Sequence, residues 1–210
     1  MPIRVVLADD HVLVRQGIRS LLEREGMQVL AEASDGQEAV RQVEKLNPDV
    51  AIIDIGMPLL NGMDTARTVS RSCPKTKSIL LTQHDEDEYV SEALHAGVKG
   101  YVLKSQVAND LVLAIRQVLR GDVYLSPGVA SAVITAYRSE SERPAHPLTA
   151  RERQVMQLIA EGKTTKDVAS LLGVSVKTAE SHRSRLMQKL DIHEIATLVR
   201  YALKRGLVQA

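Results

Sequence analysis

Residues 50–54 read VAIID and residues 78–82 read SILLT, and both runs are apolar through their centres instead of alternating with polar residues. Successive side chains of a strand point to opposite faces of its sheet, so this pattern is typical of strands that are buried on both sides. Further short β-branched or aliphatic runs occupy residues 4–8, 29–33 and 100–103. The sequence therefore predicts five strands in one covered, parallel sheet.

Longer stretches with helical spacing separate these runs. They cover residues 12–25, 36–46, 63–71, 88–96 and 107–120. Strands that alternate with helices in this way indicate an α/β, doubly wound domain with helices on both faces of a five-stranded parallel sheet.

From residue 148 to residue 210, the apolar residues recur at the spacing of a helix. Residues 127–138 read as a linker helix with proline near its first turn, and residues 139–147 (SESERPAHP) are polar and interrupted by two prolines. We therefore predict three segments: a first domain over 1–122, a linker over 123–147 and a small all-α domain over 148–210. Four helices are expected in the last segment, over 150–161, 165–172, 176–190 and 194–205. Thr149 and Glu152 form a predicted capping box at the first of them.

Composition excludes several classes of protein. The 210 residues are 44% hydrophobic and 25% charged, which rules out a disordered or collagen-like chain. No apolar run is long enough to span a membrane, and the single Cys73 excludes an internal disulfide, so a cytoplasmic protein that does not contact membranes is expected. Residues 1–143 carry 16 Lys+Arg and 20 Asp+Glu (net −4), whereas residues 144–210 carry 11 and 6 (net +5). The basic second part favours a polyanionic partner.

Polar residues follow four of the predicted strands. They are Asp9 and Asp10, Asp54, Thr82 and Lys104. Because the carboxyl ends of parallel strands share one edge of a sheet, these side chains are expected to converge there. Three carboxylates would repel each other without a cation, and oxygen ligands suit Mg²⁺, while Lys104 and Thr82 suit a phosphoryl group beside it. The alternative is that each residue merely caps a strand or a loop.

Four motifs in this part of the chain closely resemble the receiver domain of two-component response regulators. They are LADDH at 7–11, DIGMPLLNG at 54–62, LT at 81–82 and GYVLKS at 100–105. The resemblance covers about the first 120 residues and implies a flavodoxin-like fold. It also implies that Asp54 is the phosphoacceptor, with Mg²⁺ as cofactor.

The same resemblance implies a role for each neighbouring residue. Asp10 would bind Mg²⁺ directly, Asp9 largely through water, and Gly56 through its backbone carbonyl. Thr82 and Lys104 would hold the phosphoryl oxygens, with Thr82 and Tyr101 as the switch pair: Tyr101 would turn from solvent toward the core once Thr82 moves inward. In the loop after Asp54, Pro58 restricts the turn, and Gly62 is predicted to supply backbone angles that other residues resist.

Residues 165–190 (TKDVASLLGVSVKTAESHRSRLMQKL) have the pattern of a helix-turn-helix. Ala179, Leu186 and Leu190, with Val176 before them, are predicted to face inward, and His182 to be packed rather than to read bases. The outward residues are the candidates for DNA contact, charged ones for phosphates and short polar ones for base edges. These candidates are Lys177, Thr178, Glu180, Ser181, Ser184, Arg185 and Lys189. The alternative is a hairpin with a solvated polar face.

The segment from LTARE (148–152) through EGKT (161–164) to SVKTAESH (175–182) resembles the LuxR-type DNA-binding domain. Both resemblances together are those of a NarL/FixJ-type response regulator. They imply a transcription regulator with a partner histidine kinase, acting as a homodimer on a two-half-site operator in double-stranded DNA. The protein would not be an enzyme apart from Mg²⁺-dependent self-phosphorylation and self-dephosphorylation at Asp54.

Three other functions remain open from the sequence. An Asp-nucleophile phosphatase would carry a second Asp two residues after the nucleophile, where Gly56 stands here. A DNA-binding protein whose first domain serves only as a dimerisation platform would not need the complete set of Asp9, Asp10, Asp54, Thr82 and Lys104. A flavin-binding domain would require a phosphate loop, and the sequence contains none.

Overall fold

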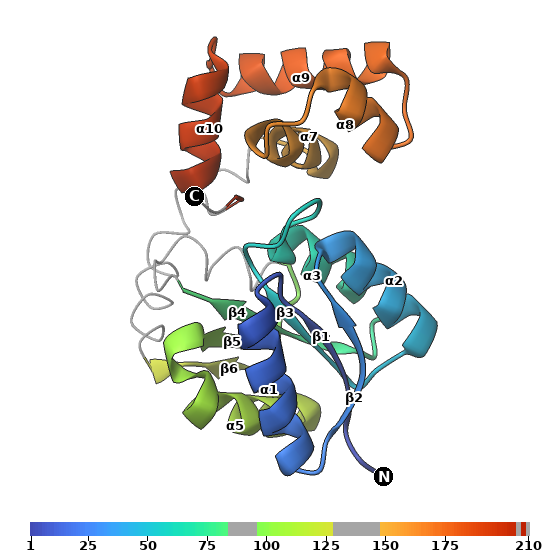
Figure 1. The fold of residues 1–210 in the computed structure, drawn as a ribbon, viewed down its shortest axis with the longest axis vertical. Coiled ribbons are helices and arrows are strands. Elements are labelled where there is room, and N and C mark those ends of the chain that lie inside the picture. Colours follow the sequence, from blue (N-terminus) through green and yellow to red (C-terminus); the bar gives the residue numbers. More distant parts are fainter. Residues whose placement is uncertain (84–95, 128–147, 205–206, 209–210) are drawn as a thin grey trace. The chain divides into compact units, whose positions relative to one another are not determined.

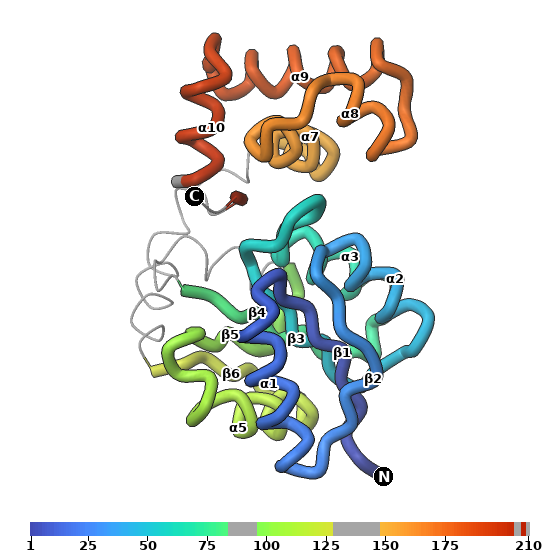
Figure 2. The backbone as a smooth tube through the Cα atoms, in the orientation of Figure 1, coloured from blue at the N-terminus to red at the C-terminus, as the bar shows by residue number. Residues whose placement is uncertain are grey.

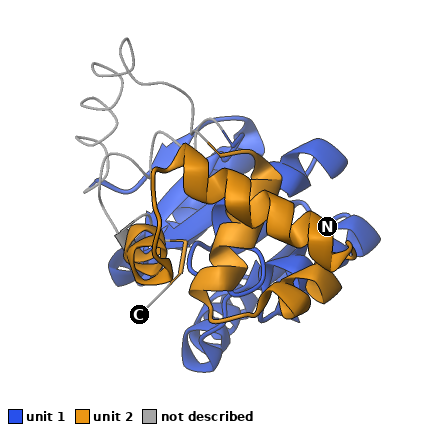
Figure 3. Ribbon diagram, turned by 90° about the horizontal axis from the view of Figure 1, so that it is seen from above, with its two compact units in different colours: residues 1–142 blue, residues 143–210 orange. Residues whose placement is uncertain are grey.

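The computed structural model of the chain describes residues 1–83, 96–127, 148–204 and 207–208. The chain divides into two compact units, Met1–Glu142 (unit 1) and Arg143–Ala210 (unit 2), which Figure 3 colours separately. Each unit has its own hydrophobic core. The predicted helices over 88–96 and 127–138 lie outside the described residues, apart from Ala96 and Pro127.

Unit 1 contains a parallel sheet in the order β2-β1-β3-β4-β5-β6. Its strands are β1 (Arg4–Ala8), β2 (Gln28–Ala33), β3 (Val50–Asp54), β4 (Lys77–Thr82), β5 (Gly100–Leu103) and β6 (Tyr124–Leu125). All five neighbouring pairs are parallel. The doubly wound α/β class is confirmed, and the strand order changes direction at β1 and β3, where such folds bind ligands. The sequence predicted five strands, and β6 is a sixth.

Helices cover both faces of this sheet (Figure 1). Helices α1 (Val12–Arg24) and α5 (Val107–Arg120) pack on one face, and α2 (Gly36–Leu46) and α3 (Gly62–Ser72) pack on the other. Each helix lies within one or two residues of its predicted range. Side-chain caps begin two of them: Asp35 accepts a hydrogen bond from the Glu38 amide at 2.7 Å, and Asn61 accepts one from the Asp64 amide at 2.9 Å.

Two hydrophobic cores result, one on each side of the sheet. In β3, Val50 and Ile52 face the α1/α5 core, whereas Ala51 and Ile53 face the α2/α3 core. All five residues of β3 are buried, while β2 at the edge of the sheet is mostly half-exposed. The central strand thus holds Asp54 at its carboxyl end on a rigid, fully packed element.

The short strand β6 is held by a buried side chain. Ser126, directly after β6, donates a hydrogen bond from Oγ to Asp110 Oδ2 at 2.7 Å and accepts one from the Leu103 amide at 3.3 Å. The Ser126 amide also donates to the Tyr101 carbonyl at 3.0 Å. Ser126 therefore fastens the end of the described part of unit 1 to the strand that carries Tyr101 and precedes Lys104.

Replacement of this serine should weaken unit 1. In Ser126→Ala, the buried Leu103 amide and the Asp110 carboxylate each lose a partner, which costs about 1–3 kcal/mol. Faster hydrogen exchange of the Leu103 amide, measured by NMR, would report the loss. Ser20→Ala, at an exposed position on α1, should change stability by less than about 0.5 kcal/mol. Equal exchange rates in both variants would contradict a fastening role for Ser126.

The described part of unit 2 consists of helices and the turns between them, and Figure 2 traces their course. They are α7 (Ala150–Ala160), α8 (Thr165–Leu171), α9 (Val176–Lys189) and α10 (Ile195–Lys204). Their core includes Met156, Leu158, Leu186 and Leu198, each fully buried. The predicted capping box at α7 is confirmed, with Thr149 and Glu152 bonded in both directions. Among the described residues, no helix has the length and apolar character needed to cross a membrane.

Candidate phosphorylation site and nucleic-acid interface

Four strands of unit 1, β1, β3, β4 and β5, bring their carboxyl-terminal residues to one edge of the sheet. Ala8, the last residue of β1, pairs with Ile53, so that Asp9 and Asp54 follow on adjacent strands. Asp54 pairs with Leu81, and the next residue, Thr82, pairs with Leu103. The convergence that the sequence predicted from strand ends is therefore present in the register of the sheet.

Lys104 joins the two buried carboxylates. It begins the short 3-10 helix η1 (Lys104–Gln106) directly after β5, and its side chain is only 9% exposed. Its Nζ lies 2.9 Å from Asp9 Oδ2 and 3.0 Å from Asp54 Oδ1. The lysine thus places one positive charge between two buried negative ones.

Asp10 and His11 lie beside these two buried carboxylates. Ligand atoms of Asp9, Asp10, His11 and Asp54 all lie within 4.8 Å of one another. His11 Nδ1 is 2.8 Å from Asp10 Oδ1, and the His11 amide donates to Asp9 Oδ1 at 2.8 Å. His11 was not among the residues predicted for this site, although it directly follows the Asp-Asp pair in the sequence.

Burial dominates the electrostatics of Asp54. It raises the pKa of this carboxyl to about 6, with a further upward effect of Asp9 and Asp10 and an opposing effect of Lys104. Burial also works against the charged form of Lys104, but the attraction of Asp54 and Asp9 outweighs it, and the pKa of Lys104 is raised. The lysine therefore stays charged, but its single positive charge does not balance the negative charges of the surrounding carboxylates.

The residues present fit a divalent cation. Asp9, Asp10 and Asp54 carry three negative charges when ionised against the single charge of Lys104. Asp54 Oδ2 is buried and accepts no hydrogen bond from any residue in the described part of the chain. An orphaned carboxylate oxygen in an acidic, oxygen-rich site is the donor set that Mg²⁺ prefers.

The switch residues predicted from the sequence lie beside this site. Thr82 is buried at the end of β4, and Tyr101 on β5 is 1% exposed, so its ring occupies an inward position in this structure. Gly56, predicted to offer its carbonyl, lies in the turn two residues after Asp54 and is half-buried.

The loop after Asp54 is shaped differently from the prediction for Gly62. This glycine does not have a positive φ. Instead, a Cβ at Gly62 would collide with the Asp54 carbonyl oxygen, and the Gly62 amide donates to the Ile55 carbonyl at 2.9 Å. The glycine is therefore required by close approach of two backbone segments, while Leu59 is the loop residue in the left-handed region, with φ 65°.

In unit 2, helices α8 and α9 form the predicted helix-turn-helix. Ser175 begins α9 and accepts a hydrogen bond from the Thr178 amide at 3.1 Å, and Gly173 in the turn has φ +61°. Arg151 of α7 donates to the Leu172 carbonyl at 2.7 Å and so holds the end of α8. Hydrogen bonds thus hold both ends of the turn between α8 and α9, one from Arg151 before it and one to Ser175 after it.

The outward face of α9 carries the residues predicted to contact DNA, and all of them are exposed. They are Lys177, Thr178, Glu180, Ser181, Ser184, Arg185 and Lys189. Ala179 and Leu186 are buried, as predicted, and His182 is half-buried. Val176 was predicted to face inward, but it is 39% exposed, because it lies at the first position of the helix, beyond the edge of the core.

Comparison with family models matches each unit to one family. Residues 5–116 match the response regulator receiver domain, and residues 146–202 match the bacterial regulatory proteins of the luxR family. The chain belongs to the NarL/FixJ-type response regulators. The predicted combination of a receiver with a LuxR-type DNA-binding domain is thereby confirmed.

Individual relatives are similar to this chain over nearly its whole length. The oxygen regulatory protein NreC of Staphylococcus epidermidis is 38% identical over 216 residues, covering 98% of this chain and 99% of the relative. RcsB of Salmonella enterica serovar Typhimurium, solved bound to a promoter with the phosphomimetic BeF3⁻, has a TM-score of 0.63 at 27% identity, covering 99% and 98% of the two chains. A structure of two RcsB dimers bound to two parallel DNAs has a TM-score of 0.59 at 28% identity, covering 96% and 98%.

The last residue of the regulator's predicted DNA face, Lys189, is paired with an acid from the start of α7. Lys189 Nζ lies 2.7 Å from Glu152 Oε2, which also accepts hydrogen bonds from the Thr149 amide and hydroxyl. Glu152 is buried, so this pair links the start of α7 to the end of α9. The sequence does not show this pairing, because the two residues lie 37 positions apart.

Proposed function

We propose that the regulator accepts a phosphoryl group on Asp54 of unit 1, and that this event controls the binding of unit 2 to DNA. The observation that carries the first half is the pairing of Lys104 with both Asp9 and Asp54, beside a buried Asp54 oxygen that has no partner among the described residues. The exposed polar face of α9, within residues 144–210 of net charge +5, carries the second half.

The chemistry at Asp54 is nucleophilic attack. A carboxylate oxygen forms a bond to the phosphorus of the donor, and the donor's leaving group departs with the electron pair of the bond that breaks. Lys104 neutralises charge on the phosphoryl oxygens, and the Thr82 hydroxyl donates a hydrogen bond to one of them. Positioning and charge compensation supply most of the rate in such transfers.

Mg²⁺ is the proposed cofactor. Asp9, Asp10, Asp54 and the backbone carbonyl of Gly56 would hold it, and the ion would supply further compensation of charge on the phosphoryl group. Phosphoryl transfer then needs only the donor and this site, so the regulator phosphorylates itself once a donor is present. A histidine kinase is the proposed physiological donor.

The proposed turnover of the acyl phosphate is slow self-dephosphorylation rather than phosphatase catalysis. A phosphatase of the Asp-nucleophile class has a second carboxylic acid where Gly56 stands in this chain. Without an acid at this position, the product persists long enough to act as a signal.

On DNA, we propose that two copies of the regulator bind a two-half-site operator in double-stranded DNA. Helix α9 would lie in the major groove, with Lys177 and Arg185 on phosphates and Thr178, Glu180, Ser181 and Ser184 at base edges. The related RcsB structures, with dimers on DNA and with a phosphomimetic at a promoter, support this arrangement.

Thr82 and Tyr101 are the proposed link between the two events. A phosphoryl group on Asp54 would bind the Thr82 hydroxyl and favour the inward position of the Tyr101 ring, which alters the surface formed by β5 and α5. A shift of this kind needs a few kcal/mol of differential stabilisation.

The experiment is a DNA-binding titration of the full chain with and without a small phosphodonor and Mg²⁺. Phosphorylation should tighten binding by about 5- to 150-fold, the range of ordinary allosteric coupling. Asp54→Asn should show no response, and Asp122→Asn, at an exposed acid outside the site, should respond as the wild type does. Equal affinity of the wild type in both conditions would contradict control by phosphorylation.

A further inference from the structure

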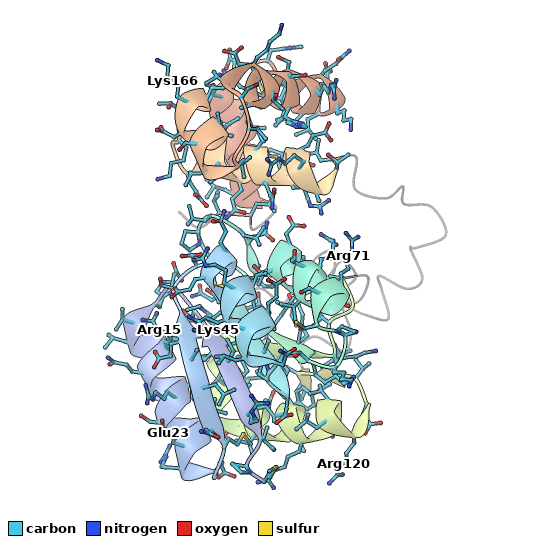
Figure 4. All side chains as sticks on the ribbon, turned by 90° about the vertical axis from the view of Figure 1, so that its right-hand side faces the viewer. Arg15, Glu23, Lys45, Arg71, Arg120 and Lys166 are labelled. Atoms are coloured by element: carbon cyan, nitrogen blue, oxygen red, sulfur yellow. The ribbon has the colours of Figure 1, made fainter. Side chains whose placement is uncertain are left out.

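Arg15, one turn into α1, reaches back to the loop that carries the acidic residues. Its Nη1 donates a hydrogen bond to the backbone carbonyl of Asp9 at 2.6 Å, and its Nε donates to Glu32 Oε2 on β2 at 2.9 Å. The Arg15 side chain is 15% exposed. Figure 4 shows Arg15 on α1 beside β2. One planar guanidinium thus connects the β1–α1 loop to the edge strand of the sheet.

Glu32 is itself held in place. Its second oxygen accepts a hydrogen bond from Arg19 Nη1 at 2.7 Å, and Arg19 also pairs with Glu23. The hydrogen bonds from Arg19 and Arg15 lower the pKa of the Glu32 carboxyl. Glu32 is therefore an ionised, fixed acceptor that sets the plane of the Arg15 guanidinium.

The Asp9 carbonyl is the group through which Arg15 holds the β1–α1 loop. The Asp9 amide donates to the Ala33 carbonyl at 3.2 Å, and the Asp9 carboxylate is held by Lys104 and by the His11 amide. Because the peptide bond is planar, the direction of the Asp9 carbonyl sets the orientation of the peptide that leads into Asp10. By holding the Asp9 carbonyl, Arg15 thereby sets the position of the Asp10 backbone, from which the Asp10 carboxylate projects.

We propose that Arg15 is a positioning residue for the divalent-cation site, acting through the Asp9 carbonyl rather than by contact with the ion. The proposal rests on the proposed Mg²⁺ site at Asp9, Asp10 and Asp54. Arg15 holds the Asp9–Asp10 peptide in the geometry that presents both carboxylates to one ion, so that binding does not have to order the loop.

A positioning role and a purely electrostatic role of Arg15 predict opposite changes in Mg²⁺ affinity when this residue is replaced. Removal of a positive charge close to an acidic site attracts a cation more strongly and would tighten Mg²⁺ binding. Release of the Asp9–Asp10 peptide would weaken it, and residues that orient metal ligands typically contribute about 10- to 100-fold in affinity. The direction of the change therefore separates the two effects.

The test is a Mg²⁺ titration of the full chain by isothermal titration calorimetry. Arg15→Gln is expected to weaken Mg²⁺ binding about tenfold. Arg15→Lys keeps the charge but cannot donate in two directions from one plane, so it should also weaken binding. Arg24→Gln is the matched control, because Arg24 is exposed on the same helix and donates to the Ser20 carbonyl instead of to Glu32 or Asp9; the Mg²⁺ dissociation constant of this variant should stay within about twofold of the wild type.

A second readout separates positioning from folding. At saturating Mg²⁺, the rate of phosphoryl uptake by Arg15→Gln from a small phosphodonor should return to near the wild-type rate, which an unfolded variant would not do. Unchanged or tighter Mg²⁺ binding by Arg15→Gln would overturn the role of Arg15, as would a weakening of equal size in Arg24→Gln.

The same titration distinguishes this proposal from the proposed function. Asp10→Ala should lose most of the Mg²⁺ affinity whatever the role of Arg15. If the wild type binds Mg²⁺ and Asp10→Ala does not, an unaffected Arg15→Gln overturns the positioning role alone. A wild type that binds no Mg²⁺ overturns the cation site and the positioning role together.

Discussion

Asp54→Asn is expected to make the Mg²⁺-free regulator more stable at neutral pH, although it removes the proposed phosphoacceptor. In the folded protein, burial raises the pKa of Asp54 to about 6, whereas the ordinary value is 3.8. The folded chain therefore binds a proton more readily than the unfolded chain between these two pH values. Stability that is present below about pH 4 is lost as the pH rises through 6, because the ionised carboxylate must be kept in a buried site.

The size of this effect follows from the shift. About two pKa units correspond to roughly 3 kcal/mol, or about a hundredfold in the folding equilibrium. Asparagine keeps the shape of the side chain without the charge, so the stability of Asp54→Asn relative to the wild type should grow between pH 4 and pH 6 and then level off. Global hydrogen exchange of the β3 amides in the presence of a chelator measures this difference within unit 1.

A buried acid with a different environment provides the control. Asp64 is also buried, but its Oδ1 lies 2.7 Å from Arg67 Nη1. Asp64→Asn removes an ion pair and should lower stability at neutral pH, opposite in sign to Asp54→Asn. Mg²⁺ should stabilise the wild type more than Asp54→Asn. A wild type that is as stable as Asp54→Asn at pH 7 without Mg²⁺ would show that Lys104 compensates Asp54 fully.

The regular part of the fold is predictable because its signals are local. An apolar run such as residues 50–54 identifies a doubly covered strand by itself, and Thr149 with Glu152 marks a helix start within four residues. The strand ends then follow from parallel topology, so the convergence of Asp9, Asp54 and Lys104 could be expected before any contact was known.

The features that the sequence did not reveal depend on contacts between distant residues. Strand β6 has only two residues and is secured by the Ser126 side chain on Leu103 and Asp110. Arg15 resembles any other charge on a helix surface until its distance to the Asp9 carbonyl is known. In each case a side chain bonds a backbone group or a carboxylate from another element, and residue type alone does not specify such a partner.

The three exposed basic residues of α9 are of two kinds, and we expect them to contribute differently to DNA binding. Lys177 and Arg185 are exposed, and no described residue forms an ion pair with either. Lys189, in contrast, is paired with the buried Glu152. A cation that already has an internal partner releases fewer counterions when it approaches DNA.

Lys177→Ala and Arg185→Ala should each weaken DNA binding about 10- to 100-fold, the range for a lost charge-assisted hydrogen bond. Each should also reduce the slope of log affinity against log salt by about one unit, because one phosphate contact is lost. Binding to specific and non-specific DNA should weaken alike, since phosphates carry no sequence information. Binding titrations between low and physiological salt measure both quantities.

Lys189→Met tests whether the paired lysine differs from Lys177 and Arg185 in its effect on DNA binding. Loss of the Glu152 partner should lower the stability of unit 2, and it should leave the salt slope close to that of the wild type. Lys75→Ala, at an exposed position of unit 1, should change neither quantity. A salt slope that falls by a full unit in Lys189→Met would mean that Lys189 leaves Glu152 for a phosphate on DNA. A slope unchanged in Lys177→Ala and Arg185→Ala would place the DNA surface elsewhere than on α9.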